Sequence, residues 1–134
     1  MHQLKKISLL LMTIVFTTFA LAQSTKENND PDVAYKTAKA YWQKEQYSLA
    51  YPIFKRLYNN GNTESNFPAH LKTDCKYYTI VCGLLTNDAT VETLAVDFIN
   101  LEYNAQKTGV MSFYLAEYYY RQKRFADANT FYAK

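Results

Sequence analysis

Few side chains in this chain have the types and spacing that chemistry needs. Past residue 22, His70 is the only histidine, and it lies five positions before Cys75, where a base and a thiol could be imagined to cooperate. No third group that would orient the histidine is apparent, so we interpret His70 as an exposed residue at a helix start and Cys75 as an inert thiol. One histidine with Cys75 and Cys82 does not match a zinc site. We expect no metal site.

Other motifs that carry chemistry are also missing from the sequence. The three glycines are isolated, so no glycine-rich phosphate loop is expected. The acidic residues in 30–32 and 87–88 have the pattern of helix caps and turns rather than of paired catalytic acids or of a calcium site. We therefore expect a protein that is not an enzyme and that needs no cofactor.

The first 22 residues have the pattern of a cleaved secretory signal. Lys5 and Lys6 precede an apolar run over 7–19, and Ala20-Leu21-Ala22 gives a small-x-small cleavage site. The alternative is an N-terminal membrane anchor, but this run is shorter than the roughly 20 residues that a spanning helix needs. The cleavage point has no cysteine, so a lipoprotein anchor is not expected. We expect an exported protein, in the periplasm or associated with the outer membrane.

Behind this signal, residues 23–30 are polar and are expected to form a disordered lead. No later segment is apolar enough for a transmembrane span in the mature chain. The mature chain would carry 13 basic against 12 acidic residues, a balance that argues against nucleic acid as a partner. Cys75 and Cys82 are about 10 Å apart along one expected helix, too far to pair with each other. They are interpreted as buried free thiols, with an intermolecular disulfide as the alternative.

Apolar and aromatic residues return three times along 31–134 with one internal spacing. In each set, a small or apolar residue is followed by another after 12 positions and by an aromatic after 16. The sets are Ala38-x-x-Tyr41 with Tyr47, Ala50 and Phe54; Cys82-x-x-Leu85 with Val91, Leu94 and Phe98; and Ala116-x-x-Tyr119 with Phe125, Ala128 and Tyr132. The second and third sets are 34 positions apart. Such a period predicts stacked helical units.

The helical spacing places the expected helices at 31–45, 47–58, 68–85, 90–103, 109–123 and from 125 onward. Asp30 is the expected cap of the first helix, with Pro31 at its first position, and Thr90 that of the fourth. The expected inner residues are Ala34, Ala38, Tyr41, Ala50, Phe54, Leu57, Leu71, Tyr78, Val81, Cys82, Leu85, Leu94, Phe98, Leu101, Leu115, Ala116 and Tyr119. Gly83, beside Cys82, indicates a close approach of two helices.

Three features interrupt this pattern. Pro52 lies about a turn inside the second helix, so that helix either begins later or bends. Residues 59–62 are expected to stop it, and the ten extra residues between the first two sets are assigned to a loop reaching Pro68. The last helix has no polar cap, which leads us to expect a truncated third unit at the front of a longer protein.

These residues resemble the tetratricopeptide repeat (TPR) family, whose signature is W-x2-L-G-x2-Y, then A-x3-F, then P. The matches are Ala38-x-x-Tyr41 with Ala50-x-x-x-Phe54, Tyr78-x-x-Val81-Cys82-x-x-Leu85 with Leu94-x-x-x-Phe98, and Leu115-Ala116-x-x-Tyr119 with Ala128-x-x-x-Tyr132. The tryptophan and the closing proline of the signature are absent. The resemblance implies an all-α fold in which about three antiparallel helical hairpins stack over 31–134 as a right-handed α-solenoid. With the signal, the chain is also similar to the N-terminal part of exported TPR proteins of Gram-negative bacteria.

The family's inner groove is lined by the first helix of each hairpin. Carried over by position, the resemblance implies a partner groove formed by Tyr35, Lys39, Trp42, Thr79, Gly83, Thr86, Phe113, Glu117, Tyr120 and Arg121. Aromatic rings flanked by single charges suit recognition of a protein or peptide. The alternative is that these rings pack against neighbouring repeats.

The function expected from the resemblance is that of an exported scaffold that binds a protein or peptide partner through this groove. A second possibility is a sensory or docking front of a longer signalling or enzymatic envelope protein. A glycan binder ranks below both, because the groove has few polar side chains beside its rings. Self-association through the uncovered last repeat is also expected.

Overall fold

The computed structural model of the chain describes residues 30–134, which form helices joined by short connections. The helices are α2 (Pro31–Gln43), α3 (Tyr47–Thr63), α4 (Ala69–Leu85), α5 (Glu92–Leu101), α6 (Ala105–Arg121) and α7 (Phe125–Tyr132), with a short 3-10 segment, η1 (Ala89–Val91), before α5. The predicted all-α class is confirmed. The predicted signal at 1–22 and most of the predicted lead lie outside the described residues.

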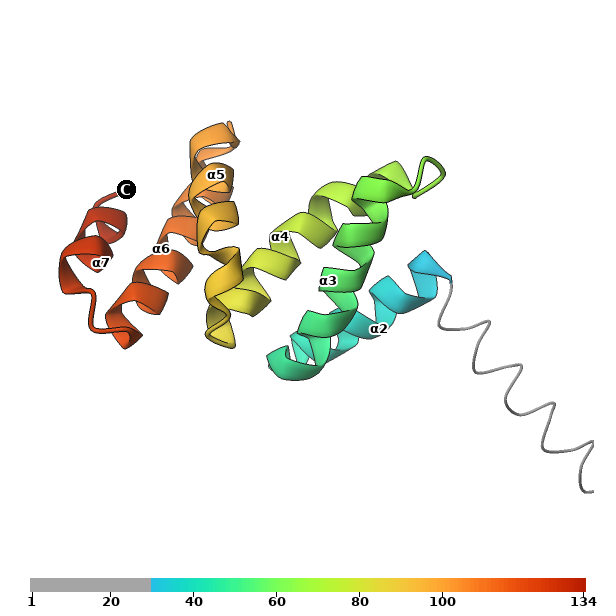
Figure 1. Cartoon of the computed structure of the whole chain (residues 1–134), viewed down its shortest axis with the longest axis horizontal. Coiled ribbons are helices and arrows are strands. Elements are labelled where there is room, and N and C mark those ends of the chain that lie inside the picture. Colours follow the sequence, from blue (N-terminus) through green and yellow to red (C-terminus); the bar gives the residue numbers. More distant parts are fainter. Residues whose placement is uncertain (1–29) are drawn as a thin grey trace, which may run out of the picture.

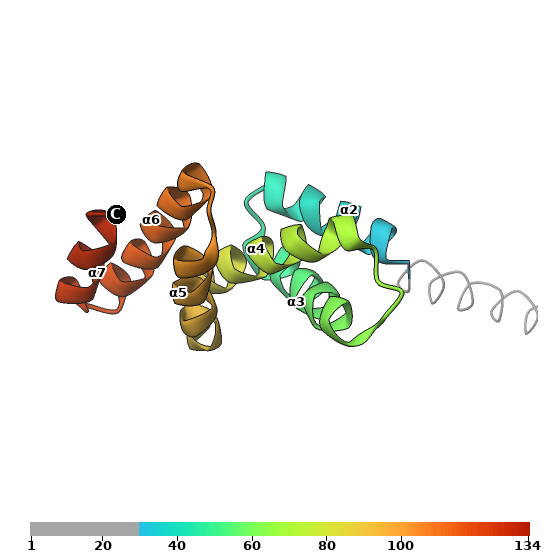
Figure 2. The same cartoon turned by 90° about the horizontal axis from the view of Figure 1, so that it is seen from above.

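The helices form one elongated row, with α2 at one end and α7 at the other (Figure 1). Each helix packs on its neighbours in the chain, and α4 also packs on α2 and α6. The view from above shows the same order (Figure 2). Buried side chains accordingly gather in three clusters along the row. Because no cluster belongs to one helix pair alone, each pair depends on the next for burial of its apolar face.

The same turn ends α2, α4 and α6. Glu45, Asn87 and Lys123 take the left-handed backbone conformation, with φ of 57°, 61° and 60°. In each turn the next residue's N–H donates to a carbonyl five residues back: Gln46 to Tyr41 (2.9 Å), Asp88 to Gly83 (2.8 Å) and Arg124 to Tyr119 (2.9 Å). This is the bond of a Schellman helix end. The backbone therefore takes the same conformation at all three of these helix ends.

The start of α2 agrees with the sequence. The side chain of Asp30 accepts hydrogen bonds from the backbone N–H groups of Asp32 (2.9 Å) and Val33 (3.4 Å). Pro31 occupies the first turn, where a missing N–H costs nothing. Ala34 and Ala38 are buried, as predicted, against α3 and α4.

Helix α3 is longer than predicted. It begins at Tyr47 and continues through Pro52, so a later start is excluded. The stop predicted at 59–62 is wrong, since α3 ends at Thr63. Gly61 is helical and buried there, and a Cβ on it would lie 3.0 Å from the ring of Phe67. The ten extra residues therefore do not form a long loop; part of them lengthens α3.

The second helical pair departs most from the repeat pattern. In the first and third units the left-handed turn residue follows the small residue by seven positions, but Asn87 follows Cys82 by only five. Cys82 is therefore not the equivalent of Ala38, and that assignment was wrong. Its side chain is buried against the first pair, beside Ala38 and Phe54.

The inner face of α5 is also shifted. Val91, Ala95 and Phe98 are buried, whereas Leu94 is half-buried and Leu101 is 68% exposed. The cause is η1, whose tighter 3-10 winding rotates the following helix relative to the pattern. Thr90, the predicted cap, lies inside η1, and α5 has no side-chain cap. Asp88 caps η1 instead, its carboxylate accepting from the backbone N–H of Thr90 at 2.9 Å.

Helix α6 begins earlier than predicted. Asn104 caps it by accepting from the N–H of Lys107 at 3.0 Å, so 107–109 are helical rather than a break between units. Gly109 has no positive φ and no neighbour within 4 Å of a built Cβ. Leu115, Ala116 and Tyr119 are buried, as predicted.

Candidate interaction surface

A row of half-buried aromatic rings crosses the first helices of the structure. Trp42, at the end of α2, lies with its ring centroid 5.0 Å from Tyr47 on α3 and 5.2 Å from Tyr78 on α4. Tyr77 follows at 5.3 Å from Tyr78. Burial raises the pKa of Tyr77 to about 12, with smaller contributions from Tyr114 on α6 and from Tyr78. Tyr114 packs against the same core cluster as Trp42 and Tyr77. The five rings, Trp42, Tyr47, Tyr77, Tyr78 and Tyr114, are called the aromatic row below.

The surface has a hollow beside the aromatic row, between α4 and α6. A second hollow, of about 390 Å³, lies among α3, α4 and α5, away from the row. The hollow beside the row has a volume of about 320 Å³ and is lined by Asp74, Tyr77, Tyr78, Gln106, Lys107 and Val110. Two tyrosines, one carboxylate and one ammonium group give it apolar area together with both signs of charge. Such a combination can seat an extended or helical segment of another protein.

The predicted groove residues of α2 are engaged with the next helix. The Tyr35 hydroxyl donates to Oδ2 of Asp74 at 2.8 Å, and burial followed by this bond raises its pKa. Lys39 donates to the Tyr78 hydroxyl and lies 4.1 Å from the centroid of that ring. Trp42 belongs to the aromatic row. The side chains of Tyr35 and Lys39 thus pack against the neighbouring helix α4 rather than line an open groove.

Helix α4 contributes little of its predicted share. Thr79 is 2% exposed, so its side chain is in the core and its placement in a groove was wrong; its hydroxyl has no hydrogen-bond partner. Thr86 donates to the carbonyl of Cys82 at 2.9 Å and so closes its own helix end. Gly83 faces Val91 and Tyr51.

The predicted residues of α6 divide between two sides. Arg121 reaches back to α4, donating to the carbonyl of Leu84 at 2.7 Å and to Oδ1 of Asn87 at 3.3 Å. Phe113 and Tyr120 are both more than half exposed, and Glu117 accepts from the Tyr132 hydroxyl on α7. These last three residues lie at the α7 side and are not part of the aromatic row.

Sequence reasoning missed four members of the row. Tyr77 and Tyr114 were not singled out, and Tyr47 and Tyr78 were assigned to the repeat core. Three of the four stand beside another aromatic, as Tyr77-Tyr78 and Phe113-Tyr114. Adjacent positions on a helix point about 100° apart, so one ring of each pair had to leave the core-facing stripe.

A carboxylate joins the first helical pair to the second. Asp88 accepts from the Tyr51 hydroxyl at 2.6 Å and from Nζ of Lys55 at 3.1 Å, in addition to its capping bond with Thr90. The hydrogen bonds from Tyr51 and Thr90 hold the pKa of Asp88 well below its usual range.

This network makes stability depend on pH in a defined direction. Because the folded pKa of Asp88 lies below the roughly 3.9 of an unfolded aspartate, its contribution is complete above about pH 5 and declines as the pH falls below about 4. We expect Asp88→Asn to lower the free energy of unfolding by about 1–2 kcal/mol at pH 7 and to weaken the acid dependence. Urea unfolding at a series of pH values measures both. Asp97→Asn, at an exposed position on α5, is the control; equal acid dependence in both variants would contradict the assignment.

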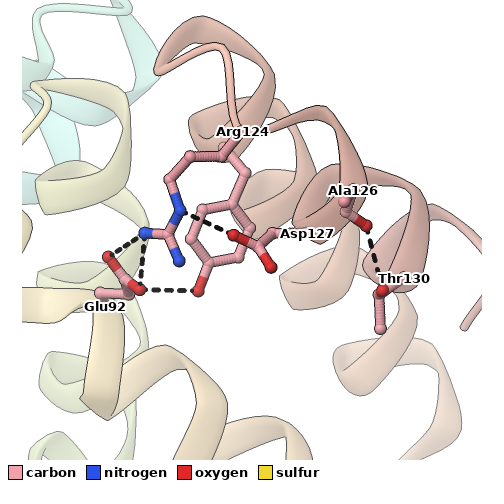
Figure 3. A network of polar contacts seen from close by, with 6 residues as sticks. Glu92, Arg124, Ala126, Asp127 and Thr130 are labelled. Atoms are coloured by element: carbon pink, nitrogen blue, oxygen red, sulfur yellow. Dashed lines mark hydrogen bonds and ion pairs between the residues drawn. The ribbon is translucent and has the colours of Figure 1, made fainter.

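The second joint lies between α5 and the last helical pair (Figure 3). Glu92 accepts from the Tyr119 hydroxyl at 2.9 Å and from Nη1 of Arg124 at 3.0 Å. The guanidinium lies 4.2 Å from the Tyr119 centroid and also donates to Asp127 at 2.7 Å. Nearby, Thr130 donates to the Ala126 carbonyl within α7. Polar contacts thus fix the orientation of successive pairs.

The imagined thiol and base do not meet. His70 is exposed and lies 3.2 Å from Oδ1 of Asp32, whereas Cys75 is completely buried among Ala34, Leu57 and Leu71. Burial raises the pKa of the Cys75 thiol to about 12, opposite to what a nucleophile requires. Among residues 30–134 no cluster of histidine, cysteine and acidic residues could hold a metal ion.

Both cysteines are free and buried, and burial raises the pKa of Cys82 to about 12 as well. We expect both thiols to react with iodoacetamide at pH 8 at least about a hundredfold more slowly in the folded protein than in urea. Mass spectrometry of samples quenched over time gives both rates. Equal rates in the two conditions would show that the thiols are accessible and would revive the intermolecular disulfide.

No described helix combines the length and apolar character needed to cross a membrane. No protein-family model, curated protein or solved structure matches the chain significantly.

Proposed function

We propose that this chain is a helical-repeat scaffold of the tetratricopeptide type that is exported to the periplasm or the outer membrane and binds a protein or peptide partner. Three observations support the repeat: a Schellman turn after α2, α4 and α6, packing of α4 on both α2 and α6, and polar joints at equivalent places between successive pairs. Export rests on the sequence of residues 1–22 alone.

The observation that carries the binding function is the aromatic row beside the α4–α6 hollow. Its rings are only half-buried, so each keeps part of its area open to contact. Tyrosine and tryptophan bring large contact area with little loss of side-chain entropy, and they dominate the energetics of protein interfaces. Lys107 and Asp74 add charges of both signs at the hollow, which favours a polypeptide over a uniformly charged ligand.

Site-specific photo-crosslinking tests this function. A photoreactive phenylalanine analogue at Gln106, which lines the hollow, should capture a partner protein in the envelope of the source cells. In the crosslinked product, the chain that carries the analogue should begin at Gln23, as expected after removal of the signal. The same analogue at Asn59, exposed on α3, is the matched control. Equal capture at both positions, or none at Gln106, would overturn the proposal.

Trp42 provides a second readout, because it is the single tryptophan of the chain and belongs to the row. Binding of the captured partner should shift its fluorescence emission. Trp42→Phe, which keeps a ring in the row, removes the signal and should leave crosslinking at Gln106 intact.

A further inference from the structure

The outer side of the last helical pair exposes four aromatic rings. Phe113 and Tyr120 lie on α6, Phe125 and Tyr132 on α7, and each is 43% to 57% exposed. They form two contacts, Phe113 with Tyr132 at 6.2 Å and Tyr120 with Phe125 at 5.4 Å between ring centroids. We call these four residues the α6–α7 aromatic face. It shares no residue with the aromatic row or with the α4–α6 hollow.

The first helical pair carries the same two contacts 78 positions earlier, the separation between the turn residues Glu45 and Lys123. Tyr35 lies 6.0 Å from Phe54, and Trp42 lies 5.0 Å from Tyr47. There, however, α4 covers them.

Tyr78 of α4 sits between two rings of that first face. It stacks on Phe54 at 5.0 Å and meets Trp42 at 5.2 Å. Phe54 is consequently fully buried, whereas Tyr132, at the equivalent place of the last pair, is 43% exposed. The α6–α7 aromatic face thus has the geometry of a seat for a helix that docks as α4 does.

The charge on the two seats is reversed. On the first, Lys39 donates to the hydroxyl of Tyr78. On the second, 78 positions later, Glu117 stands in place of Lys39. A helix on the second seat should therefore bring a cation to the place that Tyr78 occupies on the first.

Helix α2 meets this requirement at the opposite end of the row (Figures 1 and 2). The turn residues Glu45 and Asn87 align α2 with α4 at a separation of 42 positions. By this alignment Lys36 of α2 corresponds to Tyr78, and Val33 and Ala40 correspond to the two cysteines with which α4 packs on the first pair. Lys36 and Ala40 are exposed.

We propose that the α6–α7 aromatic face binds α2 of a second copy of this chain, head to tail, with Lys36 of the second copy paired with Glu117 and seated between Tyr120 and Tyr132. An ammonium group between two tyrosine rings gains cation–π attraction in addition to the ion pair. In this contact α2 of the second copy takes, on α6 and α7, the place that α4 takes on α2 and α3. Because the two surfaces differ, the contact is heterologous, and each added copy brings a further α6–α7 aromatic face, so association continues beyond a dimer.

Sedimentation velocity on the purified chain tests the proposal. Over an about hundredfold range of protein concentration, the weight-average mass should rise without stopping at a dimer. Lys36→Glu and Glu117→Lys should each weaken association about tenfold or more, because each places like charges together. The double variant, which restores opposite charges, should recover most of the association.

Lys72→Glu, at an exposed position on α4, changes the net charge by the same amount as Lys36→Glu and should leave association unchanged. Circular dichroism verifies that all variants keep their helices, as expected for side chains outside the core. A monomer at every concentration, a closed dimer, or failure of the charge swap to restore association would each overturn the proposal. None of these results bears on crosslinking at Gln106, so the two proposals fail separately.

Discussion

Phe54→Ala should lower the free energy of unfolding by about 3–5 kcal/mol, the largest effect that we expect from one substitution in this chain. The ring is completely buried. It stacks on Tyr78 at 5.0 Å and meets Tyr35 edge-on at 6.0 Å, so its removal opens a cavity where α2, α3 and α4 join. Because these contacts join two helical pairs, the loss should weaken the whole fold rather than one helix.

Tyr103→Ala is the control for this variant. Tyr103 follows α5 and its side chain is fully exposed (101%), so truncation should change stability by no more than about 0.5 kcal/mol. Urea unfolding followed by circular dichroism measures both variants. Similar midpoints for the two would mean that α4 does not rest on the first pair as described.

The sequence predicted the first and last helical pairs better than the middle one. Around Ala38 and Ala116 the signals are local: helical spacing and a short turn in both, with a capping aspartate before a proline at the start of α2. The structure places the turn residues Glu45 and Lys123 at the same distance from them. Local chemistry sufficed for these two turns, although it misplaced the end of α3 and the start of α6.

The middle pair was misplaced because local spacing does not reveal the register of its second helix. Gly83 indicated a close approach of two helices, and the structure confirms it against Val91. Nothing in the sequence indicated, however, that Val91 would belong to η1 and that the buried face of α5 would shift. The same holds for Gly61, which read as a helix stop. Its helical conformation becomes understandable once Phe67 is seen to pack on it.

The sequence did not show which aromatic rings would meet a neighbouring helix and which would stay exposed. Aromatic residues at helical spacing indicated rings beyond those the core needs, and the structure exposes or half-exposes several of them. Which rings meet a neighbouring helix depends on contacts between residues far apart in the chain. Tyr35 and Asp74 are 39 positions apart, and no pattern around Tyr35 predicts that its hydroxyl is already taken.

Gly83→Ala and Gly109→Ala form a matched pair with opposite expected signs. Both glycines are helical without positive φ, so alanine gains up to about 1 kcal/mol of helix propensity at either position. At Gly109 nothing lies within 4 Å of the added Cβ, and stability should rise by about 0.5–1 kcal/mol. At Gly83 the Cβ would lie 2.7 Å from both methyl groups of Val91, and stability should fall by about 1–3 kcal/mol.

Val91→Ala locates the cause of that loss. Alone, this truncation of a buried side chain should cost about 1–2 kcal/mol. Combined with Gly83→Ala, it removes the methyl groups that the new Cβ would meet, so the double variant should be more stable than the sum of the single losses predicts, by about 1 kcal/mol or more. Strict additivity would mean that the two positions do not touch, and the close approach of α4 and η1 at Gly83 would then be refuted.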